Sequence, residues 1–281
     1  MKMLESAKDV REFVAAAKKA GQKVGFVPTM GALHEGHLSL MRQAKKENGV
    51  VIVSIFVNPM QFGAGEDFER YPRNLQADAG KCATAGVDAI FSPSVAEIYP
   101  KGFKTLVDME DLPNHLCGRS RPGHFRGVMT VVAKLFHIVP ADTAYFGQKD
   151  YQQAQILQRM AEDLNFPIQV KVLPTFREDD GLAMSSRNAY LTPAQRQDAT
   201  ALHKALARAR EMIVDEREGS SAKVIEEMKR IVKKAKGAKV DYIAVAHTET
   251  LEDVREIRGR VLVALAVYLG KARLIDNDLI P

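Results

Sequence analysis

Four short runs of β-branched and apolar residues lie in the first 175 residues, and each predicts a buried strand. They are Val24–Val27, Val50–Val57, Thr143–Phe146 and Ile168–Leu173. Between them, apolar positions recur at helical spacing near residues 37–47, 73–86, 127–138 and 150–164. Strands separated by helix-length connections predict an α/β fold, a parallel sheet with helices on both faces. Ligands of such sheets bind beyond the carboxyl ends of the strands, so we expect the chemistry in the loops that follow them.

The pattern changes after Pro174. A polar loop leads to Thr192 and Pro193, which suit the N-cap and the first position of a helix. The pattern then predicts two helices, at about 193–216 and 220–236, and strands at Val240–Ala246 and Arg260–Leu269. This is a smaller α+β domain. We place the boundary near 175–190 and divide the chain into domains 1–175 and 176–281.

Composition indicates a globular protein, with 27% charged residues and 46% hydrophobic ones. The two cysteines, Cys82 and Cys117, have no spacing typical of a disulfide framework or a thiolate zinc site, which fits a reducing compartment. The N-terminus has no apolar signal-peptide region, and no uncharged run is apolar enough to cross a bilayer. We therefore expect a cytoplasmic protein that does not bind membranes.

The net charge of +5 comes from residues 188–239, where Lys and Arg outnumber Asp and Glu by 12 to 7. This excess lies on predicted helices and has no aromatic residues interleaved. The pattern favours a solvated helix face over a nucleic-acid footprint. The alternative is an RNA-binding module, whose affinity would fall steeply with salt.

The first stretch with candidate chemistry follows the first predicted strand and reads Pro28-Thr29-Met30-Gly31-Ala32-Leu33-His34-Glu35-Gly36-His37. Its glycines let the backbone approach a ligand, and the helix that begins around Gly36 offers free N–H groups to a phosphate. His34 and His37 are placed to donate to phosphate oxygens from one side. The alternative is an ordinary turn with two surface histidines. A zinc pair is disfavoured because the His-Glu-x-x-His spacing is one residue longer.

Two further stretches carry phosphate donors. Phe146-Gly147-Gln148-Lys149-Asp150-Tyr151-Gln152-Gln153 offers a mobile cation in Lys149 and a helix cap or ribose contact in Asp150. Asp180-Gly181-Leu182-Ala183-Met184-Ser185-Ser186-Arg187-Asn188 offers two hydroxyls and a guanidinium, in a polar loop that we expect to close as a lid. The alternatives are a plain helix start for the first stretch and a domain linker for the second.

Two loops suit a small hydroxy acid. Asn58-Pro59-Met60-Gln61-Phe62-Gly63 contains two amides, and residues 118–127 contain Arg119, Arg121, Arg126 and His124. A plain polar turn explains each loop equally well. The sequence has no P-loop and no G-x-S-x-G nucleophile elbow. Phosphate donors without a nucleophile indicate catalysis by charge and positioning.

Together these stretches resemble the pantothenate synthetase (pantoate–β-alanine ligase) family. The match runs in order through VPTMGALHEGH, FVNPMQF, RYPR, RPGHFRGV, FGQKDYQQ and DGLAMSSRN. The C-terminal segment adds no motif. One departure is Phe176, where a smaller Val is expected; the family contacts adenine there largely through backbone.

The resemblance implies a Rossmann-like, nucleotidyltransferase-like fold akin to class I aminoacyl-tRNA synthetases, and a homodimer. It implies the substrates ATP, with Mg²⁺, pantoate and β-alanine. The pantoate carboxylate attacks the α-phosphate to give pantoyl adenylate and pyrophosphate. The amine of β-alanine then displaces AMP and forms pantothenate.

The resemblance also implies the residues of the site. Those that bind ATP are Met30, Gly31, Ala32, Leu33, His34, Glu35, Gly36, His37, Gly147, Gln148, Lys149, Asp150, Phe176, Met184, Ser185, Ser186 and Arg187. The catalytic residues are His34, His37, Lys149 and Arg187, with His37 as the proton donor to the leaving phosphate oxygens. We place Gln61 and Gln153 on pantoate, with Asn58, Arg121 and His124 beside them. Asp78 is the expected contact of Mg²⁺, which bridges phosphate oxygens with few protein ligands.

Three other functions remain open at this point. A nucleotidylyltransferase would release its adenylylated product, although Gln61, Gln153 and the Arg119–Arg126 loop look suited to a hydroxy acid. An RNA-binding, synthetase-like module would use the basic face of residues 188–239. A non-catalytic adenylate sensor would produce no AMP.

Overall fold

The computed structural model describes residues 1–63 and 65–281, which divide into two compact units. The first unit consists of Met1–Glu110, Arg121–Gly147 and Gln153–Pro174. The second consists of Asp111–Ser120, Gln148–Gln152 and Thr175–Pro281. Two short segments that precede residue 175 therefore cluster with the C-terminal part of the chain.

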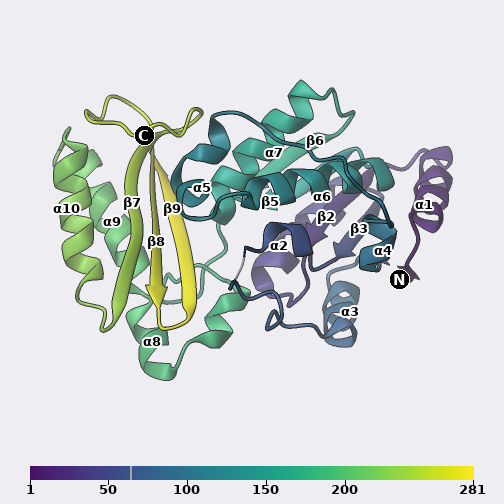
Figure 1. The fold of residues 1–281 in the computed structure, drawn as a ribbon, viewed down its shortest axis with the longest axis horizontal. Coiled ribbons are helices and arrows are strands. Elements are labelled where there is room, and N and C mark those ends of the chain that lie inside the picture. Colours follow the sequence, from purple (N-terminus) through teal and green to yellow (C-terminus); the bar gives the residue numbers. More distant parts are fainter. Residues whose placement is uncertain (64) are drawn as a thin grey trace. The chain divides into compact units, whose positions relative to one another are not determined.

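The first unit is built on the predicted parallel sheet (Figure 1). Its order is β1-β4-β3-β2-β5-β6, and all neighbouring strands run parallel. The strands are β1 (Lys2–Leu4), β2 (Val24–Thr29), β3 (Val50–Ile55), β4 (Ala89–Phe91), β5 (Thr143–Gly147) and β6 (Gln169–Leu173). The sequence pattern missed β1 and β4 because each spans only three residues, too few to show a run.

The order of the sheet reverses between β2 and β5. From β2 the chain adds β3 and then β4 on one side, and it later adds β5 and β6 on the other. A parallel sheet opens a crevice at such a switch point, beyond the carboxyl ends of the strands. The two strands end at Thr29 and Gly147, and each is followed directly by a predicted phosphate-binding stretch.

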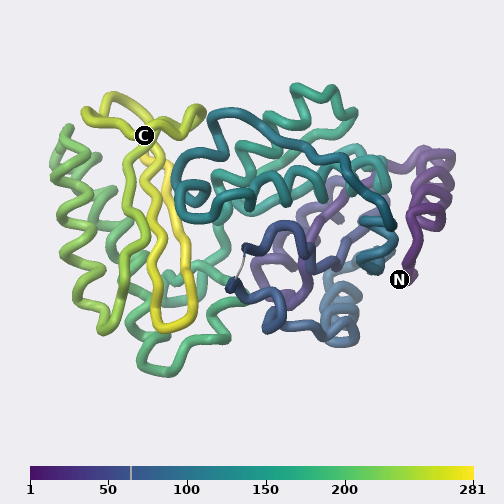
Figure 2. The backbone as a smooth tube through the Cα atoms, in the orientation of Figure 1, coloured from purple at the N-terminus to yellow at the C-terminus, as the bar shows by residue number. Residues whose placement is uncertain are grey.

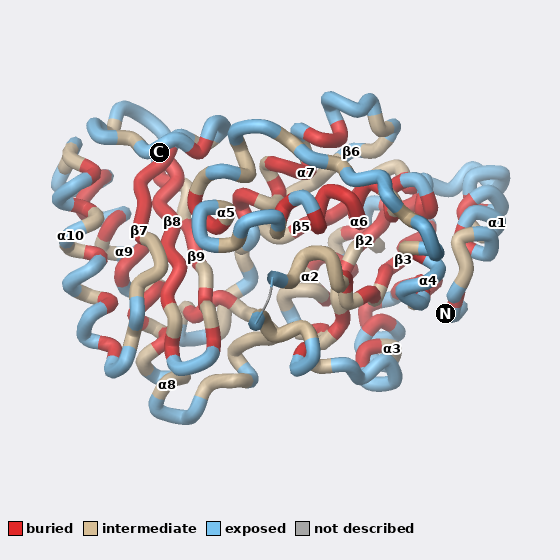
Figure 3. Tube along the Cα trace, viewed as in Figure 1, coloured by how far each residue is buried: buried red, intermediate tan, exposed pale blue. Residues whose placement is uncertain are grey.

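Helices of the first unit connect these strands. They are α1 (Ala7–Lys19), α2 (Glu35–Glu47), α3 (Leu75–Thr84), α4 (Val95–Ile98), α6 (His124–Ile138) and, from Gln153 on, α7 (Tyr151–Asp163). The apolar spacing predicts α2, α3, α6 and α7 but not α1 or α4. A short 3-10 helix, η1 (Pro59–Gln61), follows β3. Leu38 and Met41 of α2 pack with Val51 and Val53 of β3 in a buried core. Figure 3 colours the buried positions along the chain red.

The carboxyl end of α2 is anchored to the sheet by Glu47. Its carboxylate accepts hydrogen bonds from Lys171 of β6, from Tyr145 of β5 (2.7 Å) and from Gln43 (2.6 Å). The hydrogen bond from Lys171, followed by those from Tyr145 and Gln43, lowers the pKa of Glu47 to about 2. Asn48 Nδ2 donates to the Tyr145 hydroxyl at 2.8 Å. These bonds fix the helix that begins at the predicted phosphate turn.

The second unit contains an antiparallel sheet of β7 (Ala238–His247), β8 (Val261–Leu269) and β9 (Ala272–Ile280). Its helices are α5 (Leu116–Ser120), α8 (Pro193–Asp198), α9 (Ala201–Val214) and α10 (Ser221–Val232), with the 3-10 turns η2 (Leu112–Asn114), η3 (Gln148–Asp150) and η4 (Ser186–Tyr190). The apolar faces of α9 and α10 pack on β7 and β8, while β9 closes the chain at the yellow end of the trace in Figure 2.

Two details of this unit bear on the sequence predictions. Thr192 caps α8 through a hydrogen bond from Gln195 N–H, and Pro193 is its first residue, as predicted. The predicted helix 193–216 is interrupted at Ala199–Thr200, where the Thr200 N–H bonds to the carbonyl of Gln197, three residues back. No helix among the described residues is both long enough and apolar enough to span a membrane.

Candidate active site

The turn that follows β2 is tightly folded. Thr29 Oγ1 accepts a hydrogen bond from Gly31 N–H at 3.2 Å and donates to Ser54 O at 2.7 Å. Gly31 has φ of 82°, and a Cβ atom there would lie 2.9 Å from Asp78 Oδ2. Ala32 also has a positive φ, 50°. The glycine is required both for the backbone angle and for the close approach of Asp78.

Asp78 of α3 holds this turn. Its Oδ2 accepts from Ala32 N–H at 2.9 Å, and its Oδ1 accepts from Leu33 N–H at 2.8 Å. The residue is only 3% exposed. Lys81, one turn further along α3, donates to Leu33 O at 2.6 Å. Both carboxylate oxygens that we expected at a metal are therefore engaged by backbone amides, and no group of three His, Cys, Asp or Glu residues in the described chain is arranged to hold a metal ion.

The structure brings His34 and His37 together at the N-terminus of α2, as predicted. His34 is the N-cap with extended backbone, and its N–H donates to His37 Nδ1 at 3.4 Å. The two ring centroids are 4.1 Å apart, with the planes tilted by 44°. Both side chains are half-buried. The pair lies where the helix dipole and the first N–H groups favour an anion.

Gln61 lies beside this turn. Its Nε2 is 3.1 Å from Met30 Sδ, so η1 and the turn after β2 meet at these side chains. Asn58 is 1% exposed, and its side-chain amide forms hydrogen bonds within the protein. Its Nδ2 donates to Gly127 O and to Gln61 Oε1, both at 3.1 Å, while its Oδ1 accepts from Tyr99 OH at 2.8 Å. These contacts indicate that Asn58 orients Gln61.

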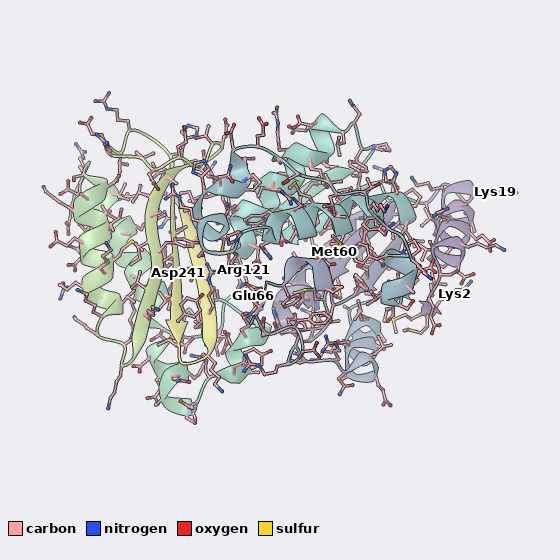
Figure 4. All side chains as sticks on the ribbon, viewed as in Figure 1. Lys2, Lys19, Met60, Glu66, Arg121 and Asp241 are labelled. Carbon is pink, nitrogen blue, oxygen red and sulfur yellow. The ribbon has the colours of Figure 1, made fainter. Side chains whose placement is uncertain are left out.

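Arg121 and His124 also act on Gln61 through its main chain. His124 Nδ1 lies 2.7 Å from Gln61 O, and Arg121 Nη2 donates to the same oxygen at 3.3 Å. Arg121 is paired with Glu66 at 2.6 and 2.7 Å, and Figure 4 shows these two side chains together. Burial alone would raise the pKa of Glu66, but the hydrogen bonds and charge of Arg121 outweigh it and hold that pKa below its ordinary value. The Arg121 charge is thus compensated within the protein.

In the second unit, Lys149 lies in η3, the turn that enters α7. Its ammonium is 3.7 Å from Asp150 Oδ2, and its side chain is 19% exposed. The two carbonyls of Gln148 and Lys149 accept hydrogen bonds from Asn277 of β9. Gly147 and Gln153, which flank this segment, belong to the first unit, and Gln153 is half-buried in the first turns of α7.

The stretch from Phe176 to Asn188 is a loop that folds back on itself. Arg177 and Ala183 form an isolated bridge, and Met184 N–H donates to Phe176 O at 3.0 Å. Ser185 caps η4 by accepting from Arg187 N–H at 3.2 Å, which places the three predicted donors in one turn. The Phe176 side chain is 40% exposed.

Arg196 of α8 secures this loop. It donates to Glu178 at 2.6 Å and to Asp180 at 2.7 Å, and the first of these acids also accepts from Asn188 Nδ2 at 3.0 Å. The hydrogen bond from Arg196 holds the pKa of Asp180 below its ordinary value. Glu178 and Asp180 are therefore paired with a cation near the phosphate donors of this loop.

Residues 2–279 match the family described as pantoate-beta-alanine ligase. The chain belongs to this family. Pantothenate synthetase of Moorella thermoacetica is 55% identical over 99% of this chain and 98% of that protein. The crystal structure of pantothenate synthetase from Thermus thermophilus superposes with a TM-score of 0.93 at 44% identity, covering 99% of each chain.

A further member of the pantoate-beta-alanine ligase family comes from Francisella tularensis and was solved in complex with beta-gamma ATP and beta-alanine. It has a TM-score of 0.82 at 38% identity, covering 99% of this chain and 97% of that one. These relatives confirm the α/β fold with a smaller C-terminal sheet.

Sequence reasoning missed several residues that orient the predicted site. They are Lys81, Glu66, Arg196, Asp276 and Asn277. Their signals are faint, because each is a single polar residue outside the glycine-bearing motifs. Asp276 and Asn277 lie next to each other in a strand that the sequence pattern did not predict, so their burial was not foreseen either.

Proposed function

We propose that this chain is the ATP-dependent ligase that condenses pantoate with β-alanine to pantothenate, releasing AMP and pyrophosphate. Membership of the pantoate-beta-alanine ligase family across residues 2–279 carries this conclusion. The histidine pair at the N-terminus of α2, at the switch point of the parallel sheet, supports it as a site for phosphates.

The first step joins two anions. A carboxylate oxygen of pantoate attacks the α-phosphorus of ATP, and the bond from that phosphorus to the bridging oxygen of pyrophosphate breaks. Such a reaction needs positive charge and in-line placement rather than a protein nucleophile. We assign the charge and hydrogen bonds to His34, His37, Lys149, Ser185, Ser186 and Arg187. His37 is the group we assign to donate a proton to the leaving phosphate oxygens.

In the second step the neutral amine of β-alanine attacks the acyl carbon of pantoyl adenylate. The bond from that carbon to the AMP oxygen breaks, and the amine loses a proton. We assign Gln61 and Gln153 to the hydroxyls and carboxylate of pantoate. The contacts of Asn58, Arg121 and His124 support an indirect part for these three residues, in which they hold Gln61 in place.

We assign the remaining contacts to the nucleotide. The backbone of Met30 to Gly36 and of Gly147 to Lys149 approaches the phosphates. Asp150 reaches the ribose, and Phe176 and Met184 approach the adenosine. Mg²⁺ enters with ATP as part of the substrate and is held mainly by phosphate oxygens and water. We further propose that the enzyme is a cytoplasmic homodimer, which light scattering and cell fractionation would test.

The test is a reconstituted reaction with the three substrates and Mg²⁺. The proposal predicts equal amounts of pantothenate, AMP and pyrophosphate, with no ADP, and no pantothenate when β-alanine is left out. Release of a stable adenylylated product without any need for an amine would instead support a nucleotidylyltransferase.

A further inference from the structure

Two adjacent polar side chains lie in the middle of β9 and are almost completely buried. Asp276 is 2% exposed and Asn277 is 4% exposed. Burying an amide and a carboxylate is unfavourable unless both are hydrogen-bonded. Successive residues of a strand point to opposite faces of the sheet, so these two side chains reach different neighbours.

Asn277 holds the backbone that carries Lys149. Its Nδ2 donates to Gln148 O at 3.0 Å and to Lys149 O at 2.9 Å, while its Oδ1 lies 3.4 Å from Gln148 Nε2. η3 runs directly into α7, and each backbone carbonyl oxygen has two lone pairs, so it can accept a side-chain N–H besides any helical hydrogen bond. A single amide with two N–H donors satisfies both of these carbonyls, which neither a carboxylate nor an apolar side chain can do.

Asp276 holds the start of the loop that carries Ser185, Ser186 and Arg187. It accepts a bidentate pair of hydrogen bonds from Arg177, at 2.7 Å from Nη1 and 3.0 Å from Nη2. Arg177 Nη1 also donates to Gly181 O at 3.0 Å, within the same loop. The bidentate geometry fixes the direction of the guanidinium as well as its distance.

We infer that Asp276 and Asn277 are positioning residues that set the two phosphate-binding segments of the second unit in a fixed relation for adenylate formation. The inference rests on the proposed roles of Lys149 and of Ser185 to Arg187. Neighbouring positions on one strand secure both segments, so the spacing between them is built into the backbone of β9. Positioning matters here because displacing a charged group by about 1 Å can slow a reaction roughly 100-fold.

The Asn277→Ala substitution tests the Lys149 side of this inference. We expect the kcat for pyrophosphate release to fall about 10- to 100-fold, with the KM values for pantoate and β-alanine unchanged. The effect should vanish in the Lys149→Ala background, because a residue that acts only through Lys149 has nothing left to position. The matched control is Asp278→Asn. Asp278 lies next to Asn277 but pairs with Arg210 of α9, and its loss should leave kcat within about twofold.

Two results would overturn the Asn277 assignment. One is near-normal kcat in folded Asn277→Ala, and the other is a full additional loss when the substitution is added to Lys149→Ala. If Asn277→Ala does not fold, Asn277→Asp keeps the volume, removes the donors and enters the same cycle. Failure of the proposed function is separate, because the wild type would then release no pyrophosphate from ATP and pantoate. Normal turnover in Lys149→Ala would refute only the role of Lys149.

Asp276→Asn tests the other segment in the same way. We expect a higher KM for ATP and a lower kcat. In the Arg187→Ala background, Asp276→Asn should change neither value further. Equal losses in the wild-type and Arg187→Ala backgrounds would show a general structural role and overturn the assignment of Asp276.

Discussion

Replacing Asp78 by Asn separates two roles for this buried acid, the clamp on the turn after β2 and the contact with Mg²⁺ that the sequence suggests. The carboxylate accepts from the N–H groups of Ala32 and Leu33 at 2.9 and 2.8 Å. An Asn side chain keeps one acceptor and turns an NH₂ group toward the second N–H. The second hydrogen bond is lost and a buried donor is left without a partner.

The cost follows from those contacts. A hydrogen bond to a charged acceptor contributes about 1.5–3 kcal/mol, and leaving a buried donor unsatisfied costs a further ~1–3 kcal/mol. Asp78 is 3% exposed, and the uncharged Asn removes the unfavourable burial of a carboxylate, which offsets part of this loss of stability. We expect a net loss of about 2–3 kcal/mol, which lowers the Tm by roughly 3–5 °C for a chain of this length. Turnover should fall at least about tenfold, because the turn also sets His34 and His37.

Calorimetry and a Mg²⁺ titration of turnover give the two readouts. If Asp78 is a clamp, the Tm falls while the Mg²⁺ concentration for half-maximal rate stays the same. A control, Asp163→Asn, removes an exposed ion pair with Arg159 on α7 and should change neither value. An unchanged Tm together with a large rise in the required Mg²⁺ would refute the clamp and restore the metal contact.

Three further predictions concern other parts of the molecule. Lys149→Ala should reduce kcat by roughly 10²–10³ through loss of a transition-state charge contact, whereas Lys233→Ala, on the exposed basic face, should leave steady-state kinetics unchanged. Glu66→Gln should raise the KM for pantoate several-fold by loosening the groups that hold Gln61, and an unchanged KM in that assay would contradict this link. Because the folded-state pKa of Glu47 is lowered to about 2, its stabilisation is present above pH 4.5 and is lost as the pH falls toward 2. Glu47→Gln should therefore destabilise the protein by about 1 kcal/mol at pH 7 in urea unfolding, with no difference from wild type near pH 2.

The sequence pattern predicted the parallel sheet because its buried strands are long apolar runs. Val50–Ile55 has no charged residue and lies in the centre of the sheet, so periodicity and burial agree there. The hydrophobic pattern did not predict strand β9. Its apolar pattern is interrupted by Asp276, Asn277 and Asp278. The partners of the first two, Arg177 and Lys149, lie about a hundred residues or more away in the sequence, and the partner of the third lies on α9.

Some residues of the candidate site can likewise be recognised in the sequence, and others cannot. Glycine-bearing turns such as that at Gly31 are visible in sequence because the backbone angle itself demands the residue. The groups that hold these turns are not, because a lone Asp78 or Glu66 has the same local pattern as any solvated acid. Only the folded chain brings Asp78 to Ala32, or Glu66 to Arg121, 55 positions further along the sequence.

Isotope exchange between pyrophosphate and ATP, with pantoate present and β-alanine absent, tests whether the protein forms pantoyl adenylate. The account predicts exchange that depends on pantoate and Mg²⁺, because pantoyl adenylate forms reversibly before any amine is needed. A folded protein that binds ATP, forms pantothenate and yet shows no such exchange would contradict the adenylate intermediate.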